Sequence, residues 1–178
     1  MPERPDRVVL VGFMGAGKST IGRRLARRLG FAFVDLDQRI EARAGRKIAA
    51  VFQEQGEAAF RELELEEARA VAALTRVVVA TGGGAFAQDA TRDALQQGAF
   101  TVWLQCSLGT ALRRVPRDGS RPLAGNRDIM RALLAEREPS YRRADVAVDT
   151  SRRAPREVVE RIVELLEGRE REKPSVRP

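Results

Sequence analysis

The sequence predicts an α/β protein in which a parallel sheet of five strands is covered by helices on both faces. Five short apolar runs, rich in valine, alternate along the chain with segments of helical periodicity. The runs are apolar at nearly every position, as expected for strands that are buried on both sides. A chain of 178 residues without internal repeats is predicted to form a single domain, over residues 1–168.

The elements are bounded by ordinary start and stop signals. The first helix, 18–29, places Ile21, Leu25 and Leu29 on one face and ends before Gly30. The predicted strands cover residues 7–11, 31–35, 76–80, 100–105 and 145–149. The remaining predicted helices cover about 37–44, 47–55, 57–74, 88–97, 107–114, 126–142 (interrupted near Pro139) and 155–167. Residues 115–125 are predicted to form a loop and 169–178 a disordered tail.

The composition narrows the classes of function. The net charge of +7 is compatible with nucleic-acid binding, but a solvated basic surface or a site for small anions is the simpler interpretation. No apolar run approaches the ~18 residues of a membrane span, and the N-terminus lacks the apolar core of a secretory signal. Cys106 is the only cysteine, so the cytoplasm is the expected location. Because histidine is absent, a carboxylate, a lysine or water has to transfer any proton.

The strongest motif is Gly-Phe-Met-Gly-Ala-Gly-Lys-Ser at 12–19, which fits G-x-x-x-x-G-K-[ST] between a predicted strand and a predicted helix. Backbone N–H groups of such a loop converge on an anion, and the helix N-terminus adds partial positive charge. The motif predicts a P-loop that binds ATP. Lys18 would reach the β- and γ-phosphates and Ser19 would bind Mg²⁺. The predicted ATP-binding residues of the loop are Gly15, Ala16, Gly17, Lys18, Ser19 and Thr20.

Two further patterns indicate which kind of P-loop protein this is. The chain has neither the Asn-Lys-x-Asp nor the Asp-x-x-G motif of a GTPase, and the strand 76–80 ends in Thr-Gly-Gly-Gly where an acidic residue is usual. The carboxylate for Mg²⁺ is therefore predicted to be Asp35, at the carboxyl end of the strand 31–35. Asp37 could face a second substrate and accept a proton from its hydroxyl or orient it. The alternative for Asp37 is a helix N-cap.

Five segments occur in the order and at about the spacing found in shikimate kinases. Residues 7–167 therefore resemble that family. The five segments are Gly-Phe-Met-Gly-Ala-Gly-Lys-Ser-Thr at 12–20, Asp35-Leu36-Asp37, Phe60-Arg61-Glu62-x-Glu64, Gly82-Gly83-Gly84 and Arg121-Pro122-Leu123. The P-loop alone is widespread, whereas the combination is much more specific. The resemblance implies a P-loop α/β/α fold of three layers, with a mobile lid at about 115–125 and substrate-binding helices at about 37–74.

The resemblance also implies a reaction and its residues. Shikimate kinases transfer the γ-phosphoryl group of ATP, with Mg²⁺, to the 3-hydroxyl of shikimate in aromatic amino acid (chorismate) biosynthesis. The implied catalytic residues are Lys18, Asp37 and Arg121, the last in the lid. The implied shikimate-binding residues are Asp37, Arg61, Gly82, Gly83, Gly84 and Arg137, and the two arginines would hold the carboxylate. Beyond the loop, Arg114, Arg121 and Arg153 are the implied contacts to ATP.

Simpler interpretations stay open for several of these residues. Arg61 and Glu64 could form an exposed ion pair, the glycines could make a tight turn, and Phe52 and Phe60 could be core residues instead of walls of a shikimate pocket. The protein could also be a kinase for another small anion such as gluconate, or an ATP-binding module without catalysis. The expected partners are ATP and shikimate, without nucleic acid or a membrane, and the family resemblance implies a monomer.

Overall fold

The central sheet is entirely parallel, as the sequence predicts. A computed structural model describes residues 5–115 and 126–172. Within them the strand order is β2-β3-β1-β4-β5, and every neighbouring pair is parallel. The strands are β1 (Arg7–Val11), β2 (Ala32–Asp35), β3 (Val77–Ala80), β4 (Phe100–Gln105) and β5 (Val146–Asp149). The register sets Val9 of β1 beside Val79 of β3 and Thr101 of β4.

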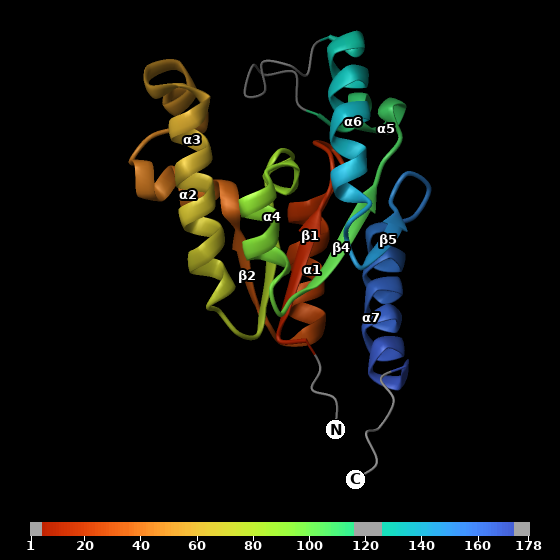
Figure 1. Ribbon diagram of the computed structural model, residues 1–178. Coiled ribbons are helices and arrows are strands. Elements are labelled where there is room, and N and C mark those ends of the chain that lie inside the picture. The colour runs from red at the N-terminus through yellow and green to blue at the C-terminus, as the bar shows by residue number, and fades with distance from the viewer. Residues whose placement is uncertain (1–4, 116–125, 173–178) are drawn as a thin grey trace.

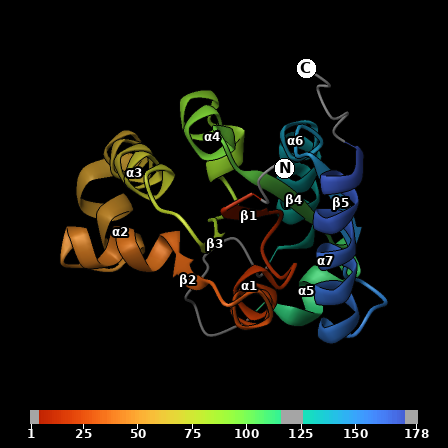
Figure 2. The ribbon, with the colours of Figure 1, turned by 90° about the horizontal axis from the view of Figure 1, so that it is seen from below.

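Helices cover both faces of this sheet, which confirms the predicted three layers. The helical elements are α1 (Lys18–Leu29), α2 (Leu36–Ala44), α3 (Ile48–Ala72), the 3-10 turn η1 (Ala85–Ala87), α4 (Asp89–Gln96), α5 (Leu108–Arg114), α6 (Arg127–Tyr141) and α7 (Pro155–Glu172). Helices α1 and α7 lie on one face, and α3, α4 and α6 lie on the other (Figures 1 and 2). No helix of the described part has both the length and the apolar content needed to cross a bilayer.

The apolar runs fill two separate cores. Successive side chains of a strand point to opposite faces. Val8 and Leu10 therefore pack under α1 and α7, whereas Val9 and Val11 pack under the helices of the other face. All five residues of β1 are buried, as are the four of β3, while β2 and β5 at the edges are partly exposed. A run of unbroken apolar residues is thus explained by burial from both sides.

The limits of the helices agree with the sequence-based expectation to within two residues, apart from the end of α7 and the interruption expected in α6. The division expected between 47–55 and 57–74 is confirmed, because the continuous element α3 is kinked at Gly56, where φ is 86° and ψ is 173°, outside the helical range. The interruption expected near Pro139 is wrong, since α6 continues to Tyr141. Pro139 lies in the last turn, and the N–H of Arg142 still donates to the carbonyl of Glu138. Helix α7 ends at Glu172, so it includes the first residues of the predicted tail.

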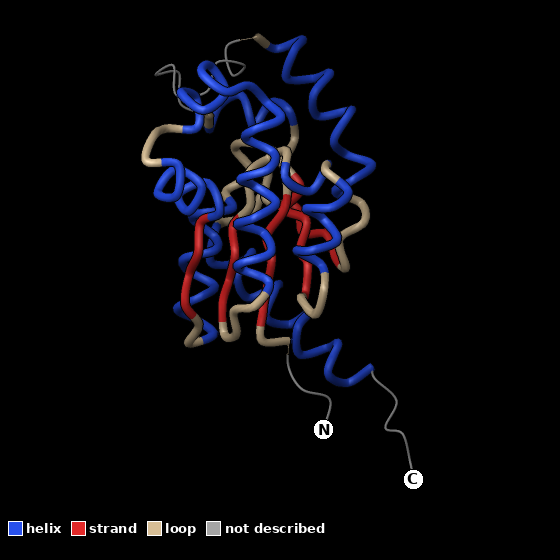
Figure 3. Tube along the Cα trace, turned by 60° about the vertical axis from the view of Figure 1, so that its left-hand side comes forward, coloured by secondary structure: helices blue, strands red, loops and turns tan. Residues whose placement is uncertain are grey.

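The carboxyl ends of the strands meet at one end of the sheet, from which the connections to α1, α2 and η1 begin (Figures 1 and 3). Strand β1 is central, and its partners β3 and β4 continue the sheet in opposite directions. Ligands of open α/β sheets bind at such a reversal point. The predicted lid with Arg121 and the tail from 173 onward lie outside the described residues.

Candidate active site

The P-loop connects β1 to α1 and lies against the end of β4. Gly12 has a φ of 143°, and a Cβ at this position would lie 2.6 Å from the carbonyl oxygen of Leu104. Any side chain would therefore push the loop away from β4. Helix α1 begins after Gly17, which has no side chain to cap the first turn. The N–H groups of that turn are consequently suited to an anionic ligand.

The P-loop forms hydrogen bonds within its own backbone and with Lys18, the first residue of α1. The Lys18 ammonium donates to the carbonyl oxygens of Gly12 at 2.7 Å and Phe13 at 3.0 Å. Ala16 is buried and its N–H donates to Phe13 O at 3.2 Å, while Thr20 is exposed in the first helical turn. The loop is therefore held in shape by its own backbone and by Lys18.

Groups beyond β4 support the loop from behind. Thr150 Oγ1 lies 3.0 Å from both Ala16 O and Gln105 O. Arg114 donates to Thr150 O at 2.8 Å and lies 3.4 Å from Gly15 O. Arg153 is exposed on the turn after β5. Of the three arginines expected near ATP, Arg114 thus contacts the loop directly, and Arg121 lies outside the described residues.

Asp35 joins two of the predicted site segments. Its Oδ2 accepts a hydrogen bond from Ser19 Oγ at 2.8 Å. Its Oδ1 accepts from the N–H groups of Asp37 and Gln38, at 3.1 and 3.3 Å, and so caps α2. The helix cap is therefore Asp35 and not Asp37, because α2 begins one residue earlier than expected. A hydroxyl and a carboxylate oxygen side by side are hard oxygen donors of the kind that Mg²⁺ prefers, together with water and phosphate.

The side chains expected to bind the second substrate lie together at the three glycines that follow β3. A Cβ at Gly82 would lie 2.6 Å from Asp37 Oδ1. A Cβ at Gly84 would lie 2.7 Å from Nη2 of Arg61 and 3.2 Å from Nη2 of Arg137. Helices α2, α3 and α6 each contribute one of these side chains. The bare backbone of the glycine turn is what lets one carboxylate and two guanidinium groups approach it.

This cluster borders the P-loop. The position of a Cβ at Gly83 would be 3.7 Å from the backbone nitrogen of Met14 and 3.1 Å from Arg137 Nη1. A molecule held by the two arginines would therefore lie beside the loop that is suited to phosphate. The geometry can bring an anionic acceptor and a nucleotide together at the end of β1.

Glu64 holds Arg61 from inside the protein. Its carboxylate accepts from Arg61 Nη1 at 2.7 Å, and its side chain is only 1% exposed, so the two residues are not an exposed ion pair. Burial raises the pKa of Glu64, although the charge of Arg61 lowers it in part. Phe60 is buried in the core, whereas Phe52 is 38% exposed and its ring lies 4.6 Å from that of Phe60. The core interpretation therefore fits Phe60 but not Phe52.

Sequence reasoning missed two buried polar residues that support this arrangement. The Tyr141 hydroxyl donates to the carbonyl oxygen of Gly83. Glu67 pairs with Arg39 at 2.6 Å and with Arg43 at 3.1 Å, and so links α3 to α2. The spacing of four residues between Arg137 and Tyr141 could have indicated that both lie on one face of the helix. Nothing in the sequence distinguishes Glu67 from the neighbouring Glu66.

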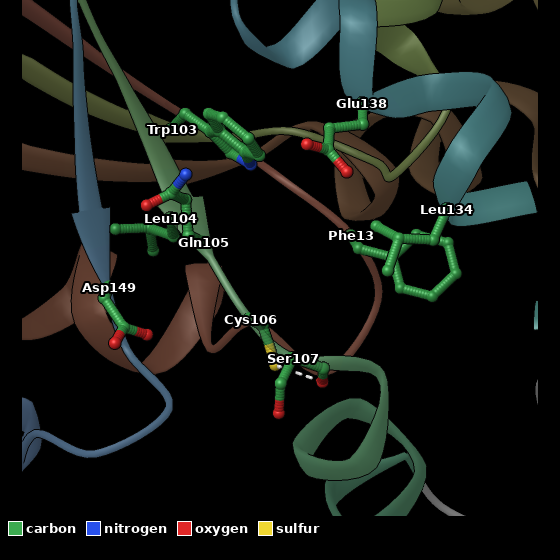
Figure 4. A pocket seen from close by; sticks show the side chains of 9 residues that line it. All are labelled: Phe13, Trp103, Leu104, Gln105, Cys106, Ser107, Leu134, Glu138 and Asp149. Carbon is green, nitrogen blue, oxygen red and sulfur yellow. Dashed lines mark hydrogen bonds between the residues drawn. The ribbon is translucent and has the colours of Figure 1, made fainter. Parts of the chain in front are cut away.

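A cavity of about 260 Å³ opens next to the P-loop, between the end of β4 and α6 (Figure 4). Its lining consists of Phe13, Trp103, Leu104, Gln105, Cys106, Ser107, Leu134, Glu138 and Asp149. Burial raises the pKa of the Cys106 thiol, so the thiol form is favoured there. Within residues 5–115 and 126–172, the lining of this cavity includes none of the predicted site residues. It adjoins the loop through Phe13 and is separate from the glycine turn that gathers Asp37, Arg61 and Arg137.

Comparison with known proteins identifies the family. The family model described as shikimate kinase matches residues 14–167. The chain belongs to the shikimate kinase family. The shikimate kinase of Chromohalobacter salexigens is 48% identical over 160 residues, which cover 88% of this chain and 89% of that protein. The shikimate kinase of Moorella thermoacetica is 43% identical over 92% of this chain and 96% of its own length.

A solved relative has the same architecture. The structure of shikimate kinase from Acinetobacter baumannii in complex with shikimate superposes with a TM-score of 0.88 at 36% identity, covering 92% of this chain and 94% of that one. The shikimate kinase fold thus extends over almost the whole chain. The predicted resemblance, which rested on five short segments, is confirmed for the family and the fold.

Proposed function

We propose that this shikimate kinase binds ATP and shikimate end to end across the carboxyl end of β1. The activity is ATP-dependent phosphorylation of shikimate in aromatic amino acid biosynthesis. One observation carries the proposed placement of the acceptor. Arg61 and Arg137 meet at Gly84, Asp37 lies against Gly82, and Gly83 between these two glycines lies beside the backbone of Met14 in the P-loop. Two guanidinium groups are the expected partners of a carboxylate, and Asp37 is the expected partner of a hydroxyl.

The nucleotide is assigned to the P-loop and the residues that support it. Backbone N–H groups of residues 15–20 would bind the phosphates, and Lys18 would turn from the loop carbonyls toward the β- and γ-phosphates. Arg114 and Arg153 are proposed to lie near the adenine and the phosphates. Arg121 is proposed to balance charge on the transferred group. The contacts of Arg114 with Gly15 and Thr150 support its place beside the loop.

Ser19 and Asp35 are the residues that would hold Mg²⁺. Their oxygens lie 2.8 Å apart, and both are hard donors, so the donor set fits this ion. Charge neutralisation on the β- and γ-phosphates is the chemistry that Mg²⁺ supplies in kinases. The Asp35 carboxylate also caps α2, and so sets the position of Asp37 two residues later.

Asp37 is proposed to act on the hydroxyl of the acceptor. The oxygen of that hydroxyl forms the new bond to the γ-phosphorus, the bond from this phosphorus to the β,γ-bridging oxygen breaks, and the hydroxyl proton passes to the Asp37 carboxylate. In the alternative, Asp37 only orients the hydroxyl. Transfer of this kind depends mainly on alignment and electrostatic stabilisation. The absence of histidine supports a carboxylate in this role.

A panel of acceptors tests the proposal. ADP release is measured with a coupled assay in the presence of shikimate, gluconate or a nucleoside, and without acceptor. The expected result is ADP release that depends on shikimate. Release with gluconate but not shikimate would indicate a kinase for another anion. ATP binding without any acceptor-dependent release would indicate a non-catalytic module. Either outcome would overturn the proposal.

We further propose a monomer that acts in the cytoplasm and requires neither nucleic acid nor a membrane. Asp37, Arg61 and Arg137 converge on the glycine turn within one chain, which supports a shikimate site that needs no second subunit. Cys106 is the only cysteine of the sequence, in keeping with a reducing compartment. Sedimentation with and without DNA, at low and high salt, tests the assembly state and the charge-driven binding together.

A further inference from the structure

A single buried phenol joins two of the residues proposed to bind shikimate. Tyr141 is the last residue of α6, and its side chain is completely buried. Its hydroxyl donates a hydrogen bond to the carbonyl oxygen of Gly83. Arg137 lies one turn earlier on the same helix, with Nη1 3.1 Å from the position of a Cβ at Gly83. The phenol thus attaches α6 to the glycine turn at the residue over which the guanidinium lies.

We propose that Tyr141 is a positioning residue for the acceptor, because its hydroxyl fixes both the glycine turn and the helix that carries Arg137. This inference rests on the proposed placement of shikimate at Gly82–Gly84, Arg61 and Arg137. Tyr141 does not contact the reacting atoms. It acts through Gly83 and Arg137, and its contribution is expected in acceptor binding and not in nucleotide binding.

The planarity of the peptide bond explains how one hydrogen bond could set the turn. The carbonyl of Gly83 and the N–H of Gly84 belong to the same peptide plane and point in opposite directions. A hydrogen bond that directs the carbonyl toward the Tyr141 hydroxyl therefore directs the N–H of Gly84 away from that hydroxyl. A peptide between two glycines can rotate with little steric penalty, so it requires a restraint from outside the turn.

The surroundings of Tyr141 keep its hydroxyl protonated, so that it can always donate a hydrogen bond to Gly83. Burial raises the pKa of the phenol to about 12, although the nearby charge of Arg137 and a hydrogen bond with it lower the pKa in part. The hydroxyl therefore stays protonated over the working range of pH. Its ring packs in the core against Trp103, with the ring centroids 6.0 Å apart. The oxygen is consequently held by packing as well as by its hydrogen bond.

The substitution Tyr141→Phe tests the inference, because it removes one oxygen and keeps the ring. The KM and the calorimetric Kd for shikimate are expected to rise roughly 5- to 50-fold, since the binding-competent arrangement of the turn becomes less populated. The Kd for ATP is expected to stay within about twofold of the wild-type value. The emission of Trp103, the single tryptophan, should be unchanged if the packing of α6 is retained.

Thr101→Val is the matched control. Thr101 is also completely buried, and its hydroxyl lies 2.8 Å from Asp145 Oδ2, at the end of the sheet away from the P-loop. This variant is expected to unfold at a lower temperature but to keep the wild-type KM for shikimate. An unchanged KM in Tyr141→Phe, or an equal rise in Thr101→Val, would overturn the positioning role. A wild-type protein that does not phosphorylate shikimate would refute the proposed function first, and the inference with it.

Discussion

Ser19 donates a hydrogen bond to Asp35 across 2.8 Å, although β3 separates β1 from β2 in the sheet. The last residue of the P-loop motif and the last residue of β2 therefore meet through their side chains. The contact places the two proposed Mg²⁺ ligands side by side. It also connects the nucleotide loop to α2, because the same carboxylate caps that helix.

Asp35→Asn is expected to weaken the use of Mg²⁺ without unfolding the protein. Asparagine is as good a helix cap as aspartate, so α2 should keep its start, but the charge that attracts the cation is lost. The Mg²⁺ concentration for half-maximal activity should rise about tenfold or more. Asp149→Asn is the control, because Asp149 also ends a strand and accepts an N–H bond at 2.8 Å, from Ser151. Identical Mg²⁺ titrations of Asp35→Asn and wild type would rule out the assignment.

Loss of a group that acts on the transferred phosphoryl group or on the accepting hydroxyl should lower turnover with little effect on folding. Lys18→Ala, Arg121→Ala and Asp37→Asn are each expected to reduce kcat by a factor of about 10² or more. Lys47→Ala, in which the removed side chain is largely exposed and far along the chain from the P-loop, should leave kcat unchanged. Steady-state kinetics and thermal melts are measured together. Near-normal turnover in Asp37→Asn would show that its assigned role is wrong.

A methyl group at Gly84 should disturb substrate binding more than stability. The added Cβ would meet Nη2 of Arg61 at 2.7 Å, which is the end of a flexible side chain and not backbone, so a shift of the guanidinium relieves the contact. Gly84→Ala is therefore expected to raise the KM for shikimate about tenfold or more, in line with loss of a charge-assisted contact, with a nearly unchanged melting temperature. In Gly109→Ala the nearest side-chain atom is an ordinary 3.7 Å away, so the KM should not change, and the melting temperature should stay the same or rise because alanine favours the helix α5 more than glycine does. A large loss of stability in Gly84→Ala would contradict this explanation.

The raised pKa of Glu64 makes its contribution to stability fall as pH rises, whereas a carboxyl group with a lowered pKa contributes more as pH rises. Because the folded-state pKa lies above the unfolded value, the contribution is fully present below the unfolded pKa and is lost as pH rises through the folded pKa. The free energy of unfolding of wild type minus that of Glu64→Gln should therefore fall as pH rises above about 4.5 and then level off. In the same range Arg61 gains its charged partner. Urea unfolding across pH checks the sign, and a difference that grows with pH would contradict it.

Two adjacent glutamates should respond very differently to loss of charge. Glu67 is buried and binds Arg39 and Arg43, whereas Glu66 is 50% exposed and, among the residues that the structure describes, binds Arg43 at 2.7 Å. Glu67→Gln is expected to lower the free energy of unfolding by about 1–3 kcal/mol, because a buried acceptor loses its charge between two guanidinium groups. Glu66→Gln should lower it by less than about 1 kcal/mol. Chemical denaturation measures both, and equal effects would show that burial is not decisive here.

Much of the fold could be predicted because its strongest signals are local. Runs such as Val-Val-Leu-Val at 8–11 have to be buried on both sides, and a phosphate loop needs its glycines where the motif has them. The expectation that Asp35 and Asp37 lie at the ligand edge followed from the position of one strand end. These features depend on a few neighbouring residues, and for that reason sequence alone could identify them.

The remainder depends on contacts between segments far apart in the chain. Whether Glu66 or Glu67 is buried is decided by the packing of α2 against α3, which no local pattern specifies. The bond from Tyr141 to Gly83 joins residues 58 positions apart. Pro139 was expected to interrupt α6, but its place in the last turn leaves few helical hydrogen bonds for it to break.

The proposed nucleotide site and the proposed shikimate site are built in different ways. The phosphate loop is one continuous stretch, whereas the groups around the glycine turn come from α2, α3 and α6. A small ring bound there would act as a cross-link among separately anchored helices, and its arrival would tighten the whole helical flank of the sheet at once. A nucleotide alone would restrain one turn and one helix.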